Sequence, residues 1–430
     1  MIPSPPLYIC PSPLITQTHS HQSLEMEVVE DTVIVGAGIA GLAASLGLYR
    51  MGLRSVVLES SDSLRATGFA FTAWTNAWKA LDALGIGDSL RQQHVQLHGL
   101  VVASVATGLA TSQVSFIAKG KLGDHEVRCV RRNMLLEALE RELPRGTIRF
   151  GSKVVSIEET WNLKLVHLAD GSILKAKVLV GCDGVNSVVA KWLGLPKPPF
   201  PRRSAARGIA EYPGGHGFKS EFLQYVGDGF RSGFLPCDEK TIYWFFTFIS
   251  SPQAKDAEEN PAKMKHYLLS LLQKAPKEVT GIIEKTELDT ILSSPLRFRF
   301  PWDVLWGRIC KNNVCVAGDA FHPMTPDLGQ GACSALEDGV TLARCIGEAL
   351  LGKSTAGGDE SGRISRGLEK YAKERRCRGF DLIPTGYVLG FIQQSNGVVM
   401  SFLRDKCLAG FMAGMYLNKA DFDCGTLFRD

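Results

Sequence analysis

The sequence predicts an α/β fold assembled from several separated stretches of the chain. Three observations indicate this. An apolar run at 32–35 is followed by a glycine-rich turn and then by an apolar helix face. Two strand-like stretches, 153–168 and 173–180, are joined by an Asp-Gly turn. A further apolar run at 314–317 again leads into glycine and a helix, so strands and helices alternate along the chain.

The first strand leads into Gly36, Gly38 and Gly41, which have the spacing G-x-G-x-x-G, with Ala37 between the first two glycines. Apolar residues then recur at helical spacing over 39–46. The first glycine permits a tight turn, the second lets a pyrophosphate approach the backbone, and the third lets helix and strand pack closely. The amino end of the helix faces the anion. This element predicts a Rossmann-like dinucleotide site.

A second apolar run, 55–58, ends at Glu59, which lies 59 − 41 = 18 residues after the third glycine. An acid at about 20 residues can accept hydrogen bonds from both ribose hydroxyls of an adenosine and repels a 2′-phosphate. The competing interpretation is a glycine-rich turn that binds nothing. It is disfavoured because strand, helix, second strand and acid are all present. The pattern does not choose between FAD and NAD.

Two later glycine motifs follow predicted strands. The strand at 173–180 ends in GCDGVNS, which contains Asp183 and Gly184. The run at 314–317 leads into Gly318 and Asp319, and a second glycine turn then opens a helix with an apolar face. Glycine directly after a strand is typical of a place where a ligand approaches the backbone.

With these motifs in this order, the chain resembles the group A flavin-dependent aromatic hydroxylases, such as para-hydroxybenzoate and salicylate hydroxylases. The resemblance rests on the turn at 36–41, on GCDGVNS at 181–187 and on GDAFHPMTPDLGQGACSALED at 318–338. VRRNMLLEAL at 130–139 resembles the family's segment with a flavin-contacting arginine, here Arg132. Together the four elements span about three quarters of the chain.

The resemblance implies FAD as the cofactor and NAD(P)H as the co-substrate. It implies that Asp319 contacts the ribityl chain, and that Asp183 and Gly184 contribute to FAD and pyridine-nucleotide binding. The helix near Gly329 would direct N–H groups at the flavin pyrimidine edge, where a helix amino terminus stabilises the negative charge of reduced flavin. The candidate cofactor-binding residues are Gly36, Ala37, Gly38, Gly41, Glu59, Arg132, Asp183, Gly184, Gly318, Asp319, Gly329, Gly331 and Ala332.

Two positions depart from the family pattern. The arginine seven residues after the aspartate of the DG motif is Ala190 here, with Lys191 next, so the choice between NADH and NADPH stays open. The asparagine of the GQGAN word is Cys333. Flavin binding is expected to survive this change, because the helix offers backbone groups. Within the family, the words GCDGVNSVVAKWLG and DCGTL are similar to the plant monooxygenase 1 branch.

The resemblance implies that NAD(P)H reduces FAD, that O2 adds to the reduced flavin, and that one oxygen atom enters a small aromatic or isoprenoid substrate by hydroxylation or epoxidation. The protein supplies orientation and a dry site, so no catalytic residue is assigned and no metal site is expected. One alternative is a flavin-dependent reductase or desaturase of the same fold. Another is a catalytically silent FAD-binding regulatory protein.

Residues from about 200 to 300 predict a mixed-sheet substrate region, with strand-like runs at 221–225, 231–235 and 241–249. Its aromatic side chains could line a cavity beneath the flavin, and Arg231 could hold a carboxylate. A plain sheet core with a surface arginine is the competing interpretation, and it is favoured for any single residue. The aromatic candidates are Phe222, Tyr225, Phe234, Tyr243 and Phe245.

The remaining polar features have ordinary interpretations. His322 is expected to be a loop residue packed beside the flavin motif rather than a general base. The basic stretch KERRCR at 373–378 is expected to be a solvated helix end rather than a contact for an anionic surface. The apolar tail from 380 to 411 has three open roles: covering the active site, forming a homodimer face, or resting on a membrane surface.

The predicted organisation is two interleaved domains and a helical tail. The FAD-binding domain has a three-layer ββα organisation. The predicted parts are a disordered extension at 1–25, the FAD-binding domain at 26–95, 126–200 and 301–345, the substrate domain at 96–125 and 201–300, and a helical region at 346–430.

Composition narrows the class of protein. The 430 residues are 45% hydrophobic and 21% charged, as in folded proteins, and the net charge of +4, without a basic cluster among aromatics, disfavours nucleic-acid binding. Eleven cysteines without a C-x-x-C pair indicate reduced thiols. No secretory signal or apolar stretch of about 20 residues is present. We expect a cytoplasmic monomer or homodimer, with the chloroplast as the alternative location.

Overall fold

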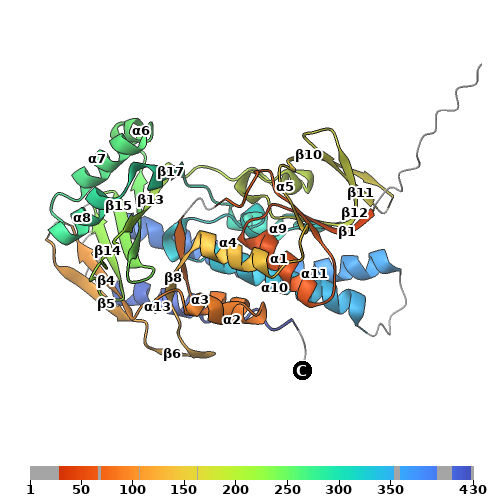
Figure 1. Ribbon diagram of the computed structural model, residues 1–430, viewed down its shortest axis with the longest axis horizontal. Helices are drawn as coiled ribbons and strands as arrows, with labels where there is room; N and C mark the ends of the chain where they lie inside the picture. Colours follow the sequence, from red (N-terminus) through yellow and green to blue (C-terminus); the bar gives the residue numbers. More distant parts are fainter. Residues whose placement is uncertain are drawn as a thin grey trace, which may run out of the picture.

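The computed structural model describes residues 29–65, 69–105, 107–161, 163–352, 359–394 and 409–427. The extension predicted at 1–25 lies outside these residues, as do residues 395–408 of the predicted tail. Two large β-sheets lie toward opposite ends of the long axis, and long helices run between them (Figure 1). The predicted α/β class is confirmed.

The first sheet has the predicted Rossmann-like strands at its centre. Strand β1 (Val29–Val35) pairs in parallel with β2 (Val56–Leu58) on one side and with β12 (Ile173–Gly181) on the other. Strand β12 also pairs in parallel with β19 (Val314–Val316). Because β1, β12 and β19 run in the same direction, the three glycine-rich turns that follow them lie at one edge of the sheet.

An antiparallel meander extends this sheet through β10 (Val154–Thr160) and β11 (Leu163–Leu168), which pairs with β12. Helices α1 (Ile39–Arg50) and α10 (Gly331–Leu351) pack against one face of the parallel strands. Helix α5 (Val188–Trp192) packs against the opposite face. The meander, the parallel strands and the helices make up the predicted ββα organisation.

The second sheet has seven strands in the order β17-β13-β16-β15-β14-β4-β5. One face packs Trp244, Phe246 and Phe248 against three helices, and this contact forms a separate hydrophobic core. The bounds are β4 Gly99–Ser104, β5 Ala110–Ser115, β13 Arg203–Glu211, β14 Glu221–Gly227, β15 Phe230–Pro236, β16 Thr241–Ile249, β17 Ile291–Pro295, α6 Pro252–Ala257, α7 Pro261–Leu271 and α8 Lys277–Lys285.

Two short strands, β9 Ile148–Arg149 and β18 Cys310–Lys311, belong to the first sheet. The remaining strands and helices are β3 Ala70–Ala73, β6 Lys119–Gly120, β7 Gly123–Asp124, β8 Arg128–Arg131, α2 Thr75–Ala83, α3 Gly87–Arg91, α4 Arg132–Arg141, α9 Pro301–Trp306, α11 Glu360–Gln394 and α13 Ala409–Ala420. Strand β4 pairs with β14 from beyond residue 200 and β5 pairs with β4 at the sheet edge, although the division into domains stays a prediction. Across the described ranges, no helix is both long enough and apolar enough to span a membrane.

The contact between α1 and α10 gives a first prediction. A Cβ added at Gly339 would stand 2.5 Å from the Ala43 Cβ and 2.7 Å from the Ala44 nitrogen, so Gly339→Ala should lower the free energy of unfolding by about 1 to 3 kcal/mol. Gly281 of α8 has open space instead, and Gly281→Ala should stabilise by about 0.5 to 1 kcal/mol. Denaturant unfolding measures both variants. Effects of the same sign would contradict the close helix contact.

Candidate functional site

The three glycine-rich turns open onto one cavity of about 610 Å³, whose other wall is formed by β13, β16 and β17 of the second sheet. Eight of the thirteen predicted cofactor residues line it: Gly38, Arg132, Gly184, Gly318, Asp319, Gly329, Gly331 and Ala332. The other five, Gly36, Ala37, Gly41, Glu59 and Asp183, are not part of the lining. The structure therefore brings segments that are up to 300 residues apart to one site.

The glycines of the first turn have different structural roles. Gly36 has a φ of +102°, and a Cβ there would stand 2.5 Å from the Cys182 carbonyl oxygen. A Cβ at Gly41 would collide with the Gly36 carbonyl oxygen. Gly38 differs, because the nearest atom to its added Cβ is Nη2 of Arg132 at 4.0 Å. Gly36 and Gly41 thus permit chain packing, whereas Gly38 leaves open space within the cavity.

Glu59 follows β2 and is anchored to the first turn. Its carboxylate accepts hydrogen bonds from the N–H of Ala37 at 3.0 Å and of Ser61 at 2.9 Å, and it forms an ion pair with Arg65 at 3.0 Å. Burial alone would raise the pKa of this carboxyl, but the two N–H groups and the Arg65 charge more than offset burial, so the pKa is lowered. Glu59 is therefore an anion that can accept hydrogen bonds from hydroxyl groups.

Asp319 and Arg132 bring opposite charges to the cavity. Asp319 lies in the short helix η3 (Gly318–Ala320), and its carboxyl is reached from the cavity although protein surrounds it. Burial raises the pKa of this carboxyl. Arg132 is the first residue of α4, and burial lowers the pKa of its guanidinium. A ligand in this part of the cavity therefore meets the Asp319 carboxyl as a hydrogen-bond acceptor and the Arg132 guanidinium as a charged donor.

In the DG motif, Gly184 lines the cavity, whereas Asp183 does not. Asp183 accepts hydrogen bonds from the Ser187 hydroxyl at 2.5 Å and the Val188 N–H at 2.6 Å, so its side chain is used within its own turn. Burial raises the pKa of Asp183, and these hydrogen bonds offset the rise only in part. Gly184 has a φ of +78° and lines the cavity. Ala190 is buried in α5, so the side chain at this position faces the core.

Helix α10 directs its amino end into the cavity. Gly329 has a φ of +66°, and Gly331 and Ala332 line the cavity where the helix begins. No side chain of the described residues caps the helix, so its first N–H groups can donate to a ligand. Cys333 instead donates its thiol to the Thr72 carbonyl oxygen at 3.4 Å and is not part of the lining. The departure from the family pattern at this position therefore lies outside the cavity.

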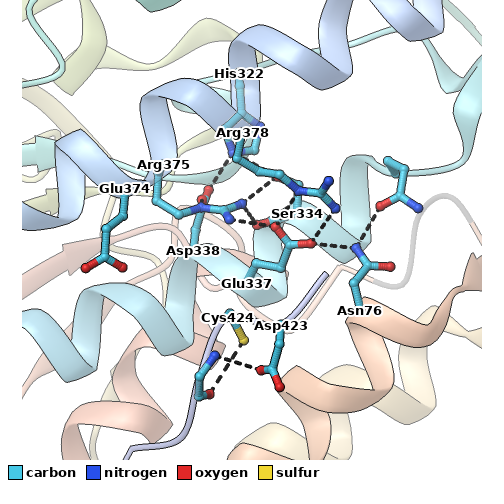
Figure 2. A network of polar contacts seen from close by, with 12 residues as sticks. Asn76, His322, Ser334, Glu337, Asp338, Glu374, Arg375, Arg378, Asp423 and Cys424 are labelled. Atoms are coloured by element: carbon cyan, nitrogen blue, oxygen red, sulfur yellow. Dashed lines mark hydrogen bonds and ion pairs between the residues drawn. The ribbon is translucent and has the colours of Figure 1, made fainter. Parts of the chain in front are cut away.

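A buried ion network lies behind the third turn and joins α10 to α11 (Figure 2). Asp338 accepts a hydrogen bond from the Gly318 N–H at 2.7 Å and forms an ion pair with Arg375 at 2.6 Å. Nε2 of His322 lies 2.6 Å from the same carboxylate. His322 is fully buried outside the cavity lining, which agrees with the predicted packed loop residue.

The second acid of this network is Glu337, which pairs with Arg375 at 2.6 Å and Arg378 at 2.9 Å. Asn76 of α2 donates to Glu337 at 2.5 Å and to Gln330 at 2.8 Å, so the network also reaches the start of α10 (Figure 2). Burial would raise the pKa of Glu337, but the charges of the two arginines lower it. The prediction that KERRCR is a solvated helix end is wrong for these two arginines, because both are buried counter-ions.

The second sheet supplies two of the five aromatic candidates to the cavity. Tyr243 and Phe245 of β16 face it. Tyr225 and Phe234 point to the opposite face, into the core under α6, α7 and α8, which agrees with the favoured interpretation of a plain sheet core. Phe222 packs edge-on against Phe245, with ring centroids 6.1 Å apart, and is not part of the lining. Successive strand residues face opposite sides, so register decides which aromatics reach the cavity.

The arginine in the cavity is Arg207, not Arg231. Nη1 of Arg231 donates to the Asp327 carbonyl oxygen at 2.9 Å and to Oε1 of Gln393 at 2.6 Å, and its side chain is buried. Arg207 of β13 is half-buried and lines the cavity opposite Phe245, and its side chain makes no hydrogen bond or ion pair with the described residues. A single arginine inside the apolar run AARGIA is the sequence signal that could have identified it.

A cavity bounded by glycine turns at the carboxyl ends of parallel strands, with an acid after the second strand, is typical of a dinucleotide-binding protein. Residues 30–382 match the family described as FAD binding domain. The chain belongs to this family, and its cofactor is FAD. The resemblance to group A flavin hydroxylases is confirmed, and the chain is an FAD-dependent monooxygenase.

Similar proteins support this assignment. The chain is 52% identical over 410 residues to Monooxygenase 2 of Arabidopsis thaliana, across 94% of this chain and all of the relative. It is 37% identical to Monooxygenase 1 of the same plant, across 92% of this chain and 98% of the relative. The crystal structure of Klebsiella pneumoniae HpxO with FAD and uric acid has the same fold, with a TM-score of 0.79 and 22% identity, covering 91% of this chain and 96% of that one.

Removing one cation tests the buried network. Arg375→Met should lower the free energy of unfolding by about 3 to 5 kcal/mol, because two buried carboxylates then share one arginine fewer. The matched control is Arg149→Met, which removes a 2.6 Å ion pair with Glu30 at the surface and should cost less than about 1 kcal/mol. Denaturant unfolding at neutral pH compares them. Similar losses in the two variants would contradict the role given to the network.

The open space at Gly38 allows cofactor binding to be tested apart from folding. Gly38→Val should fold normally but lose FAD, because the added side chain occupies the path by which a pyrophosphate approaches the backbone. Gly41→Val should instead fail to fold stably, since its Cβ meets the Gly36 carbonyl. Thermal unfolding of the apoprotein and an FAD titration separate the two effects. A Gly38→Val protein that purifies with a full complement of FAD would show that this turn is wrongly assigned.

Proposed function

We propose that this chain uses NAD(P)H and O2 to hydroxylate a small planar aromatic substrate that carries an anionic group. FAD, when bound, supplies the oxygen-activating chemistry. The side chains bind and orient the two molecules and exclude water from the cavity. The observation that carries the choice of substrate is the guanidinium of Arg207 in an aromatic-walled cavity.

The cofactor placement is part of this proposal. The first turn would hold the pyrophosphate, with Glu59 on the adenosine ribose and Asp319 on the ribityl chain. The amino end of α10, at Gly331 and Ala332, would face the flavin pyrimidine edge. Arg132 and Gly184 line the same cavity between these points. The N–H of Gly36 donates to the Leu58 carbonyl oxygen and the side chain of Asp183 is used within its own turn, so we assign both residues a supporting role.

The substrate would lie against the second sheet, between the flavin and Arg207. Tyr243 and Phe245 offer aromatic surfaces for a planar ring, and Leu292 adds apolar surface. A cation in such a site needs a counter-ion, because an unpaired charge in a low-dielectric cavity is costly. The side chain of Arg207 forms no ion pair with the described residues, and the acid near it in the lining, Asp319, also faces Arg132, so an anionic substrate would supply the remaining charge. Isoprenoids lack that charge, which favours an aromatic acid.

Names of several relatives agree with this substrate class. The chain is 28% identical to an FAD-dependent urate hydroxylase of Mycolicibacterium vanbaalenii and 25% identical to a 6-hydroxynicotinate 3-monooxygenase of Pseudomonas fluorescens. Both named substrates are planar heteroaromatic compounds with acidic groups. The nine cysteines of the described residues are free thiols, which supports a reducing compartment such as the cytoplasm.

The function is tested with purified protein, FAD, O2 and either NADH or NADPH. Aromatic acids should accelerate NAD(P)H oxidation more than their neutral amides or isoprenoids do, and ¹⁸O2 should place one labelled oxygen in the product. Product without label would indicate the reductase or desaturase alternative. FAD binding without acceleration by any compound would indicate a silent binding protein.

In the same assay, Arg207→Met should raise the KM for an aromatic acid about 10- to 100-fold, the loss expected for one charged hydrogen bond. The KM for a neutral amide and the dissociation constant of FAD should change less than about twofold. Arg202→Met is the matched control, because Arg202 is exposed just before β13 and does not line the cavity. An unchanged KM for the acid in Arg207→Met would refute this substrate contact.

A further inference from the structure

The C-terminal helix α13 contacts the cofactor site through one buried side chain, Tyr416. Its ring stacks on Trp74, with centroids 5.6 Å apart and an interplanar angle of 13°. Trp74 directly precedes α2 and packs edge-on against Phe116 on another side. Aromatic packing thus fixes where the Tyr416 hydroxyl lies.

That hydroxyl connects three separate segments. It donates to the Asp327 carbonyl oxygen at 3.2 Å and accepts from Nε2 of Gln393, in α11, at 3.2 Å. Asp327 lies in the short helix η4 (Pro326–Leu328), which leads directly into Gly329 and Gly331 of the cavity lining. A side chain from the C-terminal tail therefore holds the backbone that positions the start of α10.

Both ends of Asp327 are held, and Arg231 contributes to each, since its Nη1 also lies 3.9 Å from the Asp327 carboxylate. Its carboxylate pairs with Arg203 through two hydrogen bonds, at 2.9 and 2.7 Å. Helix α11 packs against the same carboxylate at Gly390, where a Cβ would collide with it. The carbonyl instead accepts from Tyr416 and from Nη1 of Arg231, at 2.9 Å. The orientation of the peptide after Asp327 thus depends on these two donors.

Contacts from other segments matter here, because the glycines that follow Asp327 place few limits on the backbone conformation. Gly329 and Gly331 lack the side chains that narrow backbone conformation, and Gly329 already stands at a φ of +66°. The N–H groups at the start of α10 can stabilise negative charge only if they are held in place before that charge appears. A change in the orientation of the 326–331 backbone would therefore change the electrostatics of the cavity.

We propose that Tyr416 is a positioning residue for the flavin. By fixing the loop 326–331, it sets how strongly the amino end of α10 stabilises the negative charge of reduced FAD. This inference rests on the FAD placement proposed above. It gives α13, at the end of the apolar tail, a part in the cofactor site.

A tyrosine with a purely structural role would give a different result. Such a residue stabilises the folded protein to the same extent whether the bound FAD is oxidised or reduced. A positioning residue changes the relative affinity for the two forms, and the midpoint potential of the bound flavin reports that ratio. The potential therefore separates the two roles, whereas thermal stability does not.

The test variant is Tyr416→Phe, which keeps the stacked ring and removes the hydroxyl. We expect the dissociation constant of FAD to rise about three- to tenfold. Relative affinity for reduced FAD should fall by a similar factor, which lowers a two-electron potential by about 15 to 30 mV. The matched control is Lys419→Met on the same helix, which removes the ion pair of Lys419 with Asp381 and should change neither quantity.

Two outcomes would overturn the inference. One is a Tyr416→Phe protein with a lower apoprotein melting temperature but the wild-type potential. The other is an equal fall in potential in Trp74→Phe, which keeps the hydroxyl and reduces the packing of this ring against Tyr416, Phe116 and Gly329, because the effect would then belong to packing. Failure of the FAD placement itself is distinguishable, since Gly38→Val would then retain FAD.

Discussion

The burial of Glu337 and Asp338 is the constraint on which the site depends. Two carboxylates lie side by side in the core of α10, and their desolvation is offset only when Arg375 and Arg378 of α11 face them. Asp338 also holds the Gly318 N–H of the third turn. The cofactor turn, α10 and α11 can therefore reach a low free energy only together, which joins the strand-end turns to the C-terminal third of the described chain.

Local pattern was sufficient to predict the elements that carry the cofactor turns. Apolar runs that end in glycine identify β1, β12 and β19, because a strand buried on both faces has few polar residues and its turn needs a left-handed or closely packed residue. The counter-ion role of Arg375 could not be predicted in this way. The composition of the stretch around Arg375 is the same as that expected for a solvated helix end. Only the packing of α11 on α10 places Glu337 and Asp338 opposite this arginine.

The sequence alone does not predict which side chains of the second sheet face the cavity. Tyr225, Phe234, Tyr243 and Phe245 are equally good candidates by composition, yet only the last two face the cavity. A strand places alternate residues on opposite faces, but the strand itself does not tell which face is covered by helices. That is decided by α6, α7 and α8, which follow β16 in the chain and cover the other face. Arg231 and Arg207 lie on the same face, opposite Thr247 and Phe245 of β16, and differ only because tertiary contacts with Asp327 and Gln393 occupy Arg231.

The net charge of the cavity lining depends on which arginines are already paired within the protein. Arg375, Arg378, Arg203 and Arg231 are engaged by acids or carbonyl groups of the protein, so they contribute little uncompensated field. Arg132 and Arg207 line the cavity without an ion pair, whereas Asp319 is the only acid among the described residues of its lining. The lining therefore carries a net positive charge when Asp319 is ionised, and the amino end of α10 adds to it. Such a lining favours the binding of a negatively charged group.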